Sequence, residues 1–241
     1  MIKKYFLLLL AAILLTGVHG QNRQVDLSQN IPLQDILKKA KKQKKHVLLD
    51  FGSPRCSPCL FITHKIFTID SVADFINERF VSVDYTEGPE KKRLSKIYEV
   101  YTEPVLLICD ANGRVMHRME GKCTAGEMMA RLRQGLDVKN NLTAQKLMYD
   151  NGNRSSEFLI NYLETLHIAG LRTQRDSVLH NIFSLSFHVD SLKTPKYWNV
   201  FLRYNESPVS QEGSYVFKHR EEFYKLFGEQ IVNGKITQKH R

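Results

Sequence analysis

Two cysteines separated by two residues, Cys56 and Cys59, are the feature that most constrains this chain. They follow an apolar run over residues 46–52 that is typical of a buried strand, and they precede a helical pattern over 60–67. A strand-to-helix junction places the first sulfur at a helix N-terminus, where free backbone N–H groups and the helix dipole favour a thiolate. The second sulfur comes one turn later, within reach of a disulfide. The spacing therefore predicts a reversible two-electron switch that takes part in thiol–disulfide exchange.

Residues 1–20 have the pattern of an export signal. Lys3 and Lys4 form a basic start, residues 6–15 form an apolar core, and a small residue stands at the expected cleavage site. The apolar run is shorter than the about 20 residues that a membrane span needs, so an uncleaved anchor is the less favoured alternative. We expect a mature chain that begins at Gln21, has no stable membrane span, and is periplasmic or secreted.

Length and composition limit the remaining classes of protein. The chain has 241 residues, enough after signal cleavage for one large or two modest domains with a proper core. Its four cysteines are too few for a disulfide-stapled scaffold. The net charge is +10, but the basic residues are scattered, with one cluster at 38–45 in a helical pattern. We interpret this cluster as the solvated face of a helix and expect no nucleic-acid partner; binding of nucleic acid or heparin is the alternative.

Hydrophobic periodicity changes after about residue 137. Before that point, residues 21–31 are expected to form a loose leader, and helices then alternate with strands. Helices are predicted over 32–45, 60–67, 71–80, 90–98 and 124–136, and strands over 46–52, 81–84, 104–109 and 114–120. The early strands, which helices separate, should be parallel neighbours. The turn at Asn112 and Gly113 predicts an antiparallel hairpin between the last two strands.

The C-terminal region, residues 141–241, has apolar residues at helical spacing and lacks strand-like runs. Two helices joined near Ala169 and Gly170 are expected to form a helical hairpin, and aromatic helices are expected over 190–241. We expect the aromatic residues to form a core, and a groove for a partner polypeptide is the alternative. The region is expected to bind partners or to assemble a homodimer.

Residues 32–137 resemble a thioredoxin domain. Asp50 lies six residues before Cys56, within VLLDFGSPRCSPC, which is similar to the segment that leads into the active site of thioredoxins. Pro104 begins a strand in TEPVLLICDANG, where the family carries a cis-proline that faces the disulfide. More narrowly, the chain looks like exported thioredoxin-family proteins of Bacteroides type that append a helical region. The resemblance implies an α/β thioredoxin fold, with a central mixed sheet flanked by helices, followed by an all-α region.

The resemblance also implies roles for three residues of the site. Cys56 would attack a substrate disulfide as the thiolate and form a mixed disulfide. Cys59 would then attack Cys56 and release the reduced substrate. Asp50 would lie buried beneath the pair and take the proton of Cys59, since burial raises the pKa of a carboxyl. An ordinary residue at the end of a strand is the alternative interpretation of Asp50.

Four residues around the pair are expected to bind substrate. Pro104 would lie against the disulfide and present the backbone of Glu103 for strand-like pairing with the substrate. Pro58 limits backbone freedom between the sulfurs, and the charge of Arg55 should favour the thiolate of Cys56. The carboxylate of Glu103 either selects basic partners or makes that thiolate less stable.

Together these features predict an exported protein-disulfide oxidoreductase, with reduction favoured over oxidation or isomerisation. It would need no bound cofactor and no metal, its substrates would be disulfide-containing proteins, and another dithiol protein would donate electrons. One alternative is a redox-sensitive binding module whose helical half recognises a partner protein. Another is a thiol peroxidase, which would need an arginine and a threonine near its reactive cysteine. Arg55 and Thr63 support this alternative only weakly. A zinc site would need two further ligands; Cys109, Cys123 and His64 are available but lack matched spacing.

The two remaining cysteines lie outside the motif. Cys109 is in the middle of a predicted strand and should be a buried apolar thiol. Cys123 should lie on the active-site side of the domain, either as an inert thiol or as a third redox thiol. A bridge between these two is not expected, since they lie toward opposite ends of the antiparallel pair. His117 is expected at the surface.

Overall fold

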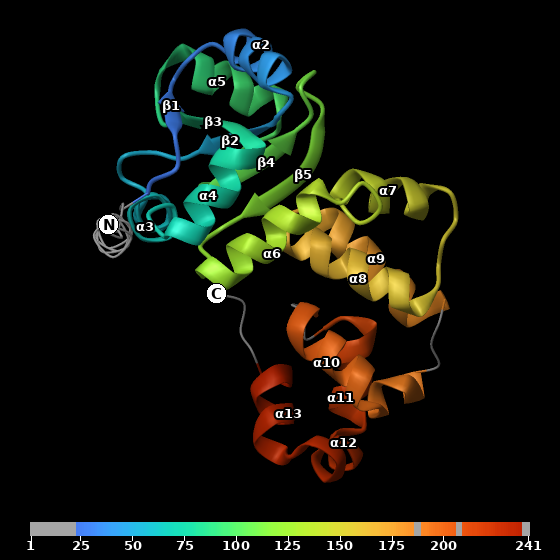
Figure 1. Cartoon of the computed structure of the whole chain (residues 1–241). Coiled ribbons are helices and arrows are strands. Elements are labelled where there is room, and N and C mark those ends of the chain that lie inside the picture. Colours follow the sequence, from blue (N-terminus) through green and yellow to red (C-terminus); the bar gives the residue numbers. More distant parts are fainter. Residues whose placement is uncertain (1–22, 186–188, 206–208, 238–241) are drawn as a thin grey trace, which may run out of the picture.

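The computed structural model describes residues 23–185, 189–205 and 209–237 (Figure 1). The predicted export signal, residues 1–20, lies outside these ranges. The strands are β1 (Leu27–Gln29), β2 (His46–Phe51), β3 (Phe80–Tyr85), β4 (Val105–Cys109) and β5 (Val115–Glu120). The helices among them are α2 (Leu33–Gln43), α3 (Ser57–Phe61), the π-helix η1 (Ile62–Ile66), α4 (Asp70–Arg79), α5 (Gly88–Ile97) and α6 (Ala125–Leu136).

The strands form one mixed sheet in the order β1-β3-β2-β4-β5. Strands β2 and β3 are parallel, as expected of strands that a helix connects, and β4 runs antiparallel to both β2 and β5. Helices α2 and α5 cover one face, and η1, α4 and α6 cover the other. The predicted mixed sheet flanked by helices is therefore confirmed. This arrangement places the end of β2 next to the start of β4, where the two cysteines and Pro104 lie.

The N-terminal segment corrects one expectation. A loose leader is expected over residues 21–31, but Leu27–Gln29 form β1, which pairs in parallel with β3. The segment is also held by backbone hydrogen bonds, one from Val25 N–H to the carbonyl of Phe67 at 3.1 Å. A three-residue strand containing serine and glutamine has no apolar run of its own. Its structure comes from the edge of β3, which supplies the hydrogen-bond partners.

The C-terminal region contains helices and no strand among the residues that the structure describes. Its helices are α7 (Leu142–Asp150), α8 (Ser156–Ile168), α9 (Arg172–Leu185), the 3-10 helix η2 (Val189–Lys193), α10 (Pro195–Tyr204), α11 (Gln211–Lys218), α12 (Arg220–Phe227) and α13 (Glu229–Ile236). Helices α8 and α9 form the predicted hairpin. The aromatic residues form a core, as expected: the Trp198 ring stacks on Phe227, with ring centroids 4.6 Å apart. Within the described ranges, no helix combines the length and apolar character that crossing a bilayer requires.

Helices α7 and α8 lie beside β5, the edge strand of the sheet, and α9 packs against α8 (Figure 1). The buried guanidinium of Arg118 donates through Nε to the carbonyl of Ala169 at 2.9 Å, in the turn after α8. On the other face of β5, the backbone N–H of Leu142 donates to Nδ1 of His117 at 3.1 Å. The hydroxyl of Thr143 in α7 also donates to the backbone carbonyl of Val115 at 2.9 Å, so the helical region pairs a backbone group that the edge of β5 would otherwise expose.

The burial of His117 contradicts the expectation that it lies at the surface. Its side chain is fully buried, and its Nε2 has no hydrogen-bond partner among the described residues. Burial, aided by the charge of Arg131, lowers the pKa of His117 to about 4, so the imidazole is neutral at pH 7. The sequence around His117 mixes apolar and charged residues, and the imidazole is buried because α6 and α7 pack over β5.

Candidate active site

The two cysteines begin a helix, as their position in the sequence predicts. Cys56 is the N-cap of α3, and its sulfur accepts a hydrogen bond from the backbone N–H of Cys59 at 3.2 Å. Cys56 and Cys59 form a disulfide, with their Cα atoms 5.2 Å apart. Cys56 is half-buried, whereas Cys59 is buried on the inner side of the helix. Of the two sulfurs, that of Cys56 is therefore the one that an incoming molecule reaches.

A glycine allows the end of β2 to pass close under the disulfide. A Cβ atom added to Gly52 would lie 3.2 Å from both Cβ and Sγ of Cys59. Contacts of that length are tighter than most Cβ contacts in proteins. Since side chains alternate along a strand, Asp50 lies on the same face as Gly52, which is the face toward Cys59. The structure therefore places a carboxyl group beneath the buried sulfur.

Asp50 is buried, as predicted, and it lies opposite a second carboxyl group. The register of β2 and β3 pairs Asp50 with Asp84, on the same face of the sheet. Burial, together with the neighbouring Asp84, raises the pKa of Asp50 to about 8. Burial raises the pKa of Asp84 to about 6, although Lys91 opposes the shift. Asp50 can therefore accept or release a proton near neutral pH.

Lys91 of α5 connects the loops on either side of the redox pair. Its Nζ donates to the carbonyl of Gly52 at 2.6 Å, to the carbonyl of Thr86 at 3.1 Å, and to Oε1 of Glu103 at 2.5 Å. Although partial burial favours the neutral acid, the hydrogen bond from Lys91 lowers the pKa of Glu103 below its usual value. The negative charge of Glu103 beside the disulfide is thus balanced by an ammonium group.

Glu103 and Pro104 occupy the position that the sequence predicts for them. The peptide bond between them is cis. A carboxylate oxygen of Glu103 and the sulfurs of Cys56 and Cys59 all lie within 4.8 Å of one another. The carbonyl of Pro104 accepts a hydrogen bond from Gly121 N–H at 3.0 Å, which joins this loop to the end of β5.

This half of the chain matches a known family. Residues 33–136 match the family described as the thioredoxin-like domain. They form a thioredoxin-like domain. The match includes the disulfide, Asp50 and the cis-proline, and it ends where the helical region begins.

Solved structures resemble the thioredoxin-like domain, and each covers about half of the chain. A candidate disulphide-isomerase from Bacteroides thetaiotaomicron is 27% identical, with a TM-score of 0.45, and the match covers 49% of this chain and 98% of that one. A thioredoxin from Thermus thermophilus is 22% identical, with a TM-score of 0.43 and coverages of 49% and 93%. A DsbH oxidoreductase is 19% identical, with a TM-score of 0.41 and coverages of 52% and 93%. No curated protein matches the chain.

The remaining predicted residues of the thioredoxin-like domain lie around the disulfide. Pro58 is in the first turn of α3 and is exposed, as is Arg55 immediately before Cys56. The hydroxyl of Thr63 donates to the carbonyl of Cys59 at 3.2 Å, inside the helix. It is therefore bound to the backbone and not to the sulfur of Cys56, which is where a peroxidase mechanism would need it.

Sequence reasoning misses two residues of the site, Lys91 and Asp84. Lys91 lies in a polar helix among other charged residues, so nothing local distinguishes it. Asp84 stands out in the sequence only as the end of a strand. Only the observed bounds of the two parallel strands pair it with Asp50; the bounds predicted from the sequence do not. Both residues reach the site through the register of β2 and β3 and the packing of α5.

The other two cysteines of the thioredoxin-like domain are free and buried. Burial raises the pKa of Cys109 to about 12, in keeping with the expected apolar thiol. Burial likewise raises the pKa of Cys123, which favours the inert interpretation over a third redox thiol. In the part of the chain that the structure describes, the one group of three donors close enough to hold a metal is formed by Cys56, Cys59 and Glu103. Its two sulfurs are bonded to each other in this structure.

Proposed function

We propose that the chain is an exported thiol–disulfide oxidoreductase that reduces disulfides in proteins. The observation that carries the proposal is the asymmetry of the redox pair: the sulfur of Cys56 is accessible at a helix N-terminus, and that of Cys59 is buried. An accessible thiolate can attack a substrate, while a shielded second thiol can resolve the resulting intermediate. The match of residues 33–136 to the thioredoxin-like domain supports the same chemistry.

In the first step, the reduced Cys56 thiolate attacks one sulfur of a substrate disulfide. A new bond forms between Sγ of Cys56 and that sulfur, the substrate disulfide breaks, and the second substrate sulfur leaves as a thiolate that takes up a proton. The backbone N–H of Cys59, which already points at Sγ of Cys56, favours the attacking thiolate.

In the second step, Cys59 resolves the mixed disulfide. Its thiol loses a proton to the ionised form of Asp50, which is the minor form at pH 7, and its sulfur attacks Sγ of Cys56. The bond between Cys56 and the substrate breaks, and the substrate sulfur leaves as a thiolate. The protein ends with the Cys56–Cys59 disulfide, and two electrons have passed to the substrate. A pKa of about 8 suits Asp50 to take this proton and to release it later.

The place of action is inferred from the export signal predicted at residues 1–20. Outside the cytosol protein disulfides persist, so substrates for such an enzyme are present there. Each turnover leaves the pair oxidised, and a second dithiol protein must therefore return two electrons to it. We propose that the mature chain is periplasmic or secreted. N-terminal sequencing of the exported protein should give Gln21 as the first residue.

The reduction potential of the pair tests the direction of electron flow. The chain without residues 1–20 is equilibrated in glutathione buffers, and the fraction of reduced protein is measured by thiol alkylation, with Cys56→Ser as the control. A potential near about −270 mV, as in thioredoxin, supports a reductant. A potential near about −120 mV, as in DsbA, indicates an oxidant and overturns the proposed direction.

Two activity assays test the alternatives. Reduction of insulin by dithiothreitol should be faster with the protein than without it, and Cys56→Ser should abolish the gain. If no reversible couple and no insulin reduction are found, the chain is a binding module instead. If peroxide is consumed faster than insulin is reduced, it is a thiol peroxidase.

A further inference from the structure

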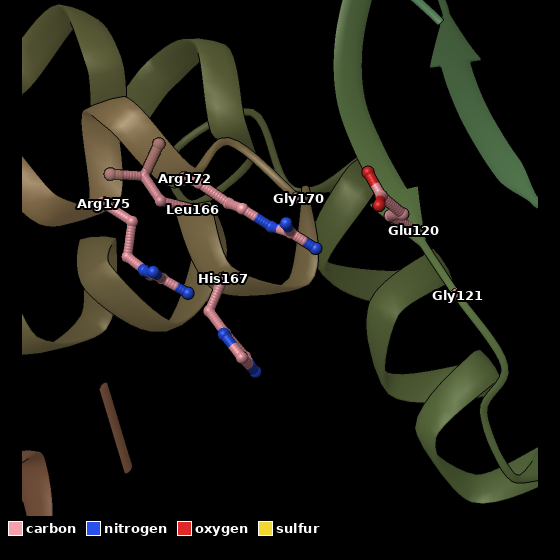
Figure 2. Close-up of a pocket in the computed structure, with 7 residues that line it drawn as sticks. All are labelled: Glu120, Gly121, Leu166, His167, Gly170, Arg172 and Arg175. Atoms are coloured by element: carbon pink, nitrogen blue, oxygen red, sulfur yellow. The ribbon is translucent and has the colours of Figure 1, made fainter. Parts of the chain in front are cut away.

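A cavity opens where the end of β5 meets the turn between α8 and α9 (Figure 2). Its volume is about 210 Å³. Sites for drug-sized ligands are larger, about 300–1,000 Å³, so this space suits a single side chain better than a bound cofactor. It is formed jointly by the thioredoxin-like domain and the helical region, and neither half would have it alone.

The cavity lies at the end of β5, and the neighbouring strand β4 begins beside the redox site. Gly121, which lines it, donates its N–H to the carbonyl of Pro104 at 3.0 Å. Glu120, also in the lining, lies opposite Val105 in the ladder of β4 and β5. Pro104 in turn comes directly after Glu103, whose carboxylate is within 4.8 Å of both sulfurs. An extended polypeptide that reacts at Cys56 can therefore continue past Gly121 into the cavity.

Two charged residues in the lining have partners within the protein. The carboxylate of Glu120 lies 3.8 Å from Nη2 of Arg118. The guanidinium of Arg175 is buried, and its Nε and Nη2 donate to Oδ1 of Asp176 at 3.0 and 2.8 Å. These two pairs leave little net charge in the cavity wall. The sign of the net charge of the wall therefore depends on Arg172.

Arg172 adds a further positive charge to the lining of the cavity. It is exposed, and its side chain makes no hydrogen bond or ion pair with any described residue. Figure 2 shows it reaching across the cavity toward the strand that carries Glu120. Arg172 also begins α9, a helix of 14 residues whose N-terminus carries partial positive charge. An anionic group in the cavity would meet both charges.

We propose that this cavity, the α8–α9 subsite, binds an acidic side chain of the polypeptide whose disulfide is at Cys56. The inference rests on the proposed function, because it specifies the substrate of the same site. The size of the cavity favours one side chain, the charge of Arg172 favours a carboxylate, and the link through Gly121 and Pro104 favours a residue close in sequence to the substrate cysteine.

A binding measurement tests the subsite without any redox reaction. Two short labelled peptides are compared by fluorescence anisotropy, both with serine in place of cysteine, one with glutamates and the other with glutamines at the same positions. The glutamate peptide should bind the full chain about three to ten times more tightly at low salt. Arg172→Glu should remove or reverse this preference. Equal binding of the two peptides by the wild-type chain overturns the subsite.

A matched variant controls for the overall positive charge of the protein. Arg220 lies on α12 in the helical region, and its side-chain ion pair is with the adjacent Glu221. Arg220→Glu changes the net charge by the same amount as Arg172→Glu but should leave the preference for glutamate unchanged. If both variants lose the preference equally, the attraction is non-specific and the subsite is wrong.

Reduction kinetics separate failure of the subsite from failure of the proposed function. Disulfide-containing versions of the two peptides are reduced by the wild-type chain and by Arg172→Glu. The expected result is a preference of about three- to tenfold in kcat/KM for the glutamate peptide in the wild type only. Equal rates for both peptides overturn the subsite while the function stands. Preferential binding without reduction of either peptide overturns the function while the subsite stands.

Discussion

Asp50 lies opposite Asp84 on neighbouring parallel strands, with both carboxyl groups on the face of the sheet beneath the disulfide. Two carboxyl groups so close cannot both ionise easily, because each charge disfavours the other and burial disfavours both. The pKa of Asp50 is raised to about 8 and that of Asp84 to about 6. The more exposed of the two ionises first, which leaves Asp50 as the group that titrates near neutral pH.

Asp50→Asn should stabilise the oxidised protein, and increasingly so as the pH rises. Unfolded Asp50 ionises near pH 3.8, while the folded carboxyl stays protonated up to about pH 8. The free energy of unfolding of the wild-type chain therefore falls as the pH rises from 4 to about 8, because only the unfolded chain ionises this group. Relative to the wild type, the substitution should raise the free energy of unfolding by as much as about 5 kcal/mol at pH 8 and by little at pH 4. Urea unfolding followed by far-UV circular dichroism measures this difference.

Two choices make the Asp50 measurement specific. The single tryptophan, Trp198, lies in the helical core, so its fluorescence does not report on the sheet. Asp84→Asn is the comparison, and its stabilising effect should be smaller and level off near pH 6. A stability difference for Asp50→Asn that does not change with pH would mean that Asp50 is ionised in the folded protein.

Cys59→Ser should trap the mixed disulfide. Without the buried thiol, the bond between Cys56 and the substrate cannot be resolved from within the protein. Incubation of the reduced variant with an oxidised substrate should accumulate a covalent adduct, visible by non-reducing electrophoresis and removed by dithiothreitol. Cys56→Ser should give no adduct. If the adduct forms at Cys59 in that variant, the assigned order of the two cysteines is reversed.

Glu103→Gln should speed alkylation of reduced Cys56 at pH 7. The Glu103 carboxylate lies within 4.8 Å of both sulfurs, so its removal should increase the fraction of thiolate. Lys91→Met removes the balancing ammonium and should decrease that fraction. At this distance each change is expected to alter the rate of reaction with iodoacetamide by about two- to tenfold, in opposite directions. Changes in the same direction would indicate a structural disturbance in place of an electrostatic effect.

Two glycines of α6 should respond differently to alanine. A Cβ at Gly135 would overlap Cδ1 of Ile108 and lie 3.1 Å from Cβ of His117. Gly135→Ala should therefore cost about 1–3 kcal/mol through overpacking. Gly126 has no neighbouring atom within 4 Å, so Gly126→Ala should be neutral or stabilise by up to about 1 kcal/mol. Urea unfolding measures both, and equal effects would mean that α6 does not pack tightly on β5.

Much of the site is predictable because its signals are local. Cys56 and Cys59 are close in sequence, and the residues before and after them specify a strand and a helix. The same holds for the hairpin of β4 and β5, which its turn predicts, and for the pair α8 and α9, which helical periodicity predicts. Asp50 and Pro104 are identified by the resemblance of their surrounding segments to thioredoxins, and not by periodicity.

The sequence by itself determined the redox pair, the order of helices and strands between residues 32 and 137, and the helical character of the C-terminal region. The tertiary structure alone decided that Asp84 faces Asp50, that Lys91 neutralises Glu103, and that His117 is buried. Each of these depends on strand register or on the packing of helices onto the sheet. Such packing brings together residues far apart in the chain, and no local pattern records it. The cavity beside Gly121 has the same origin, since it exists only where the helical hairpin meets the edge of β5.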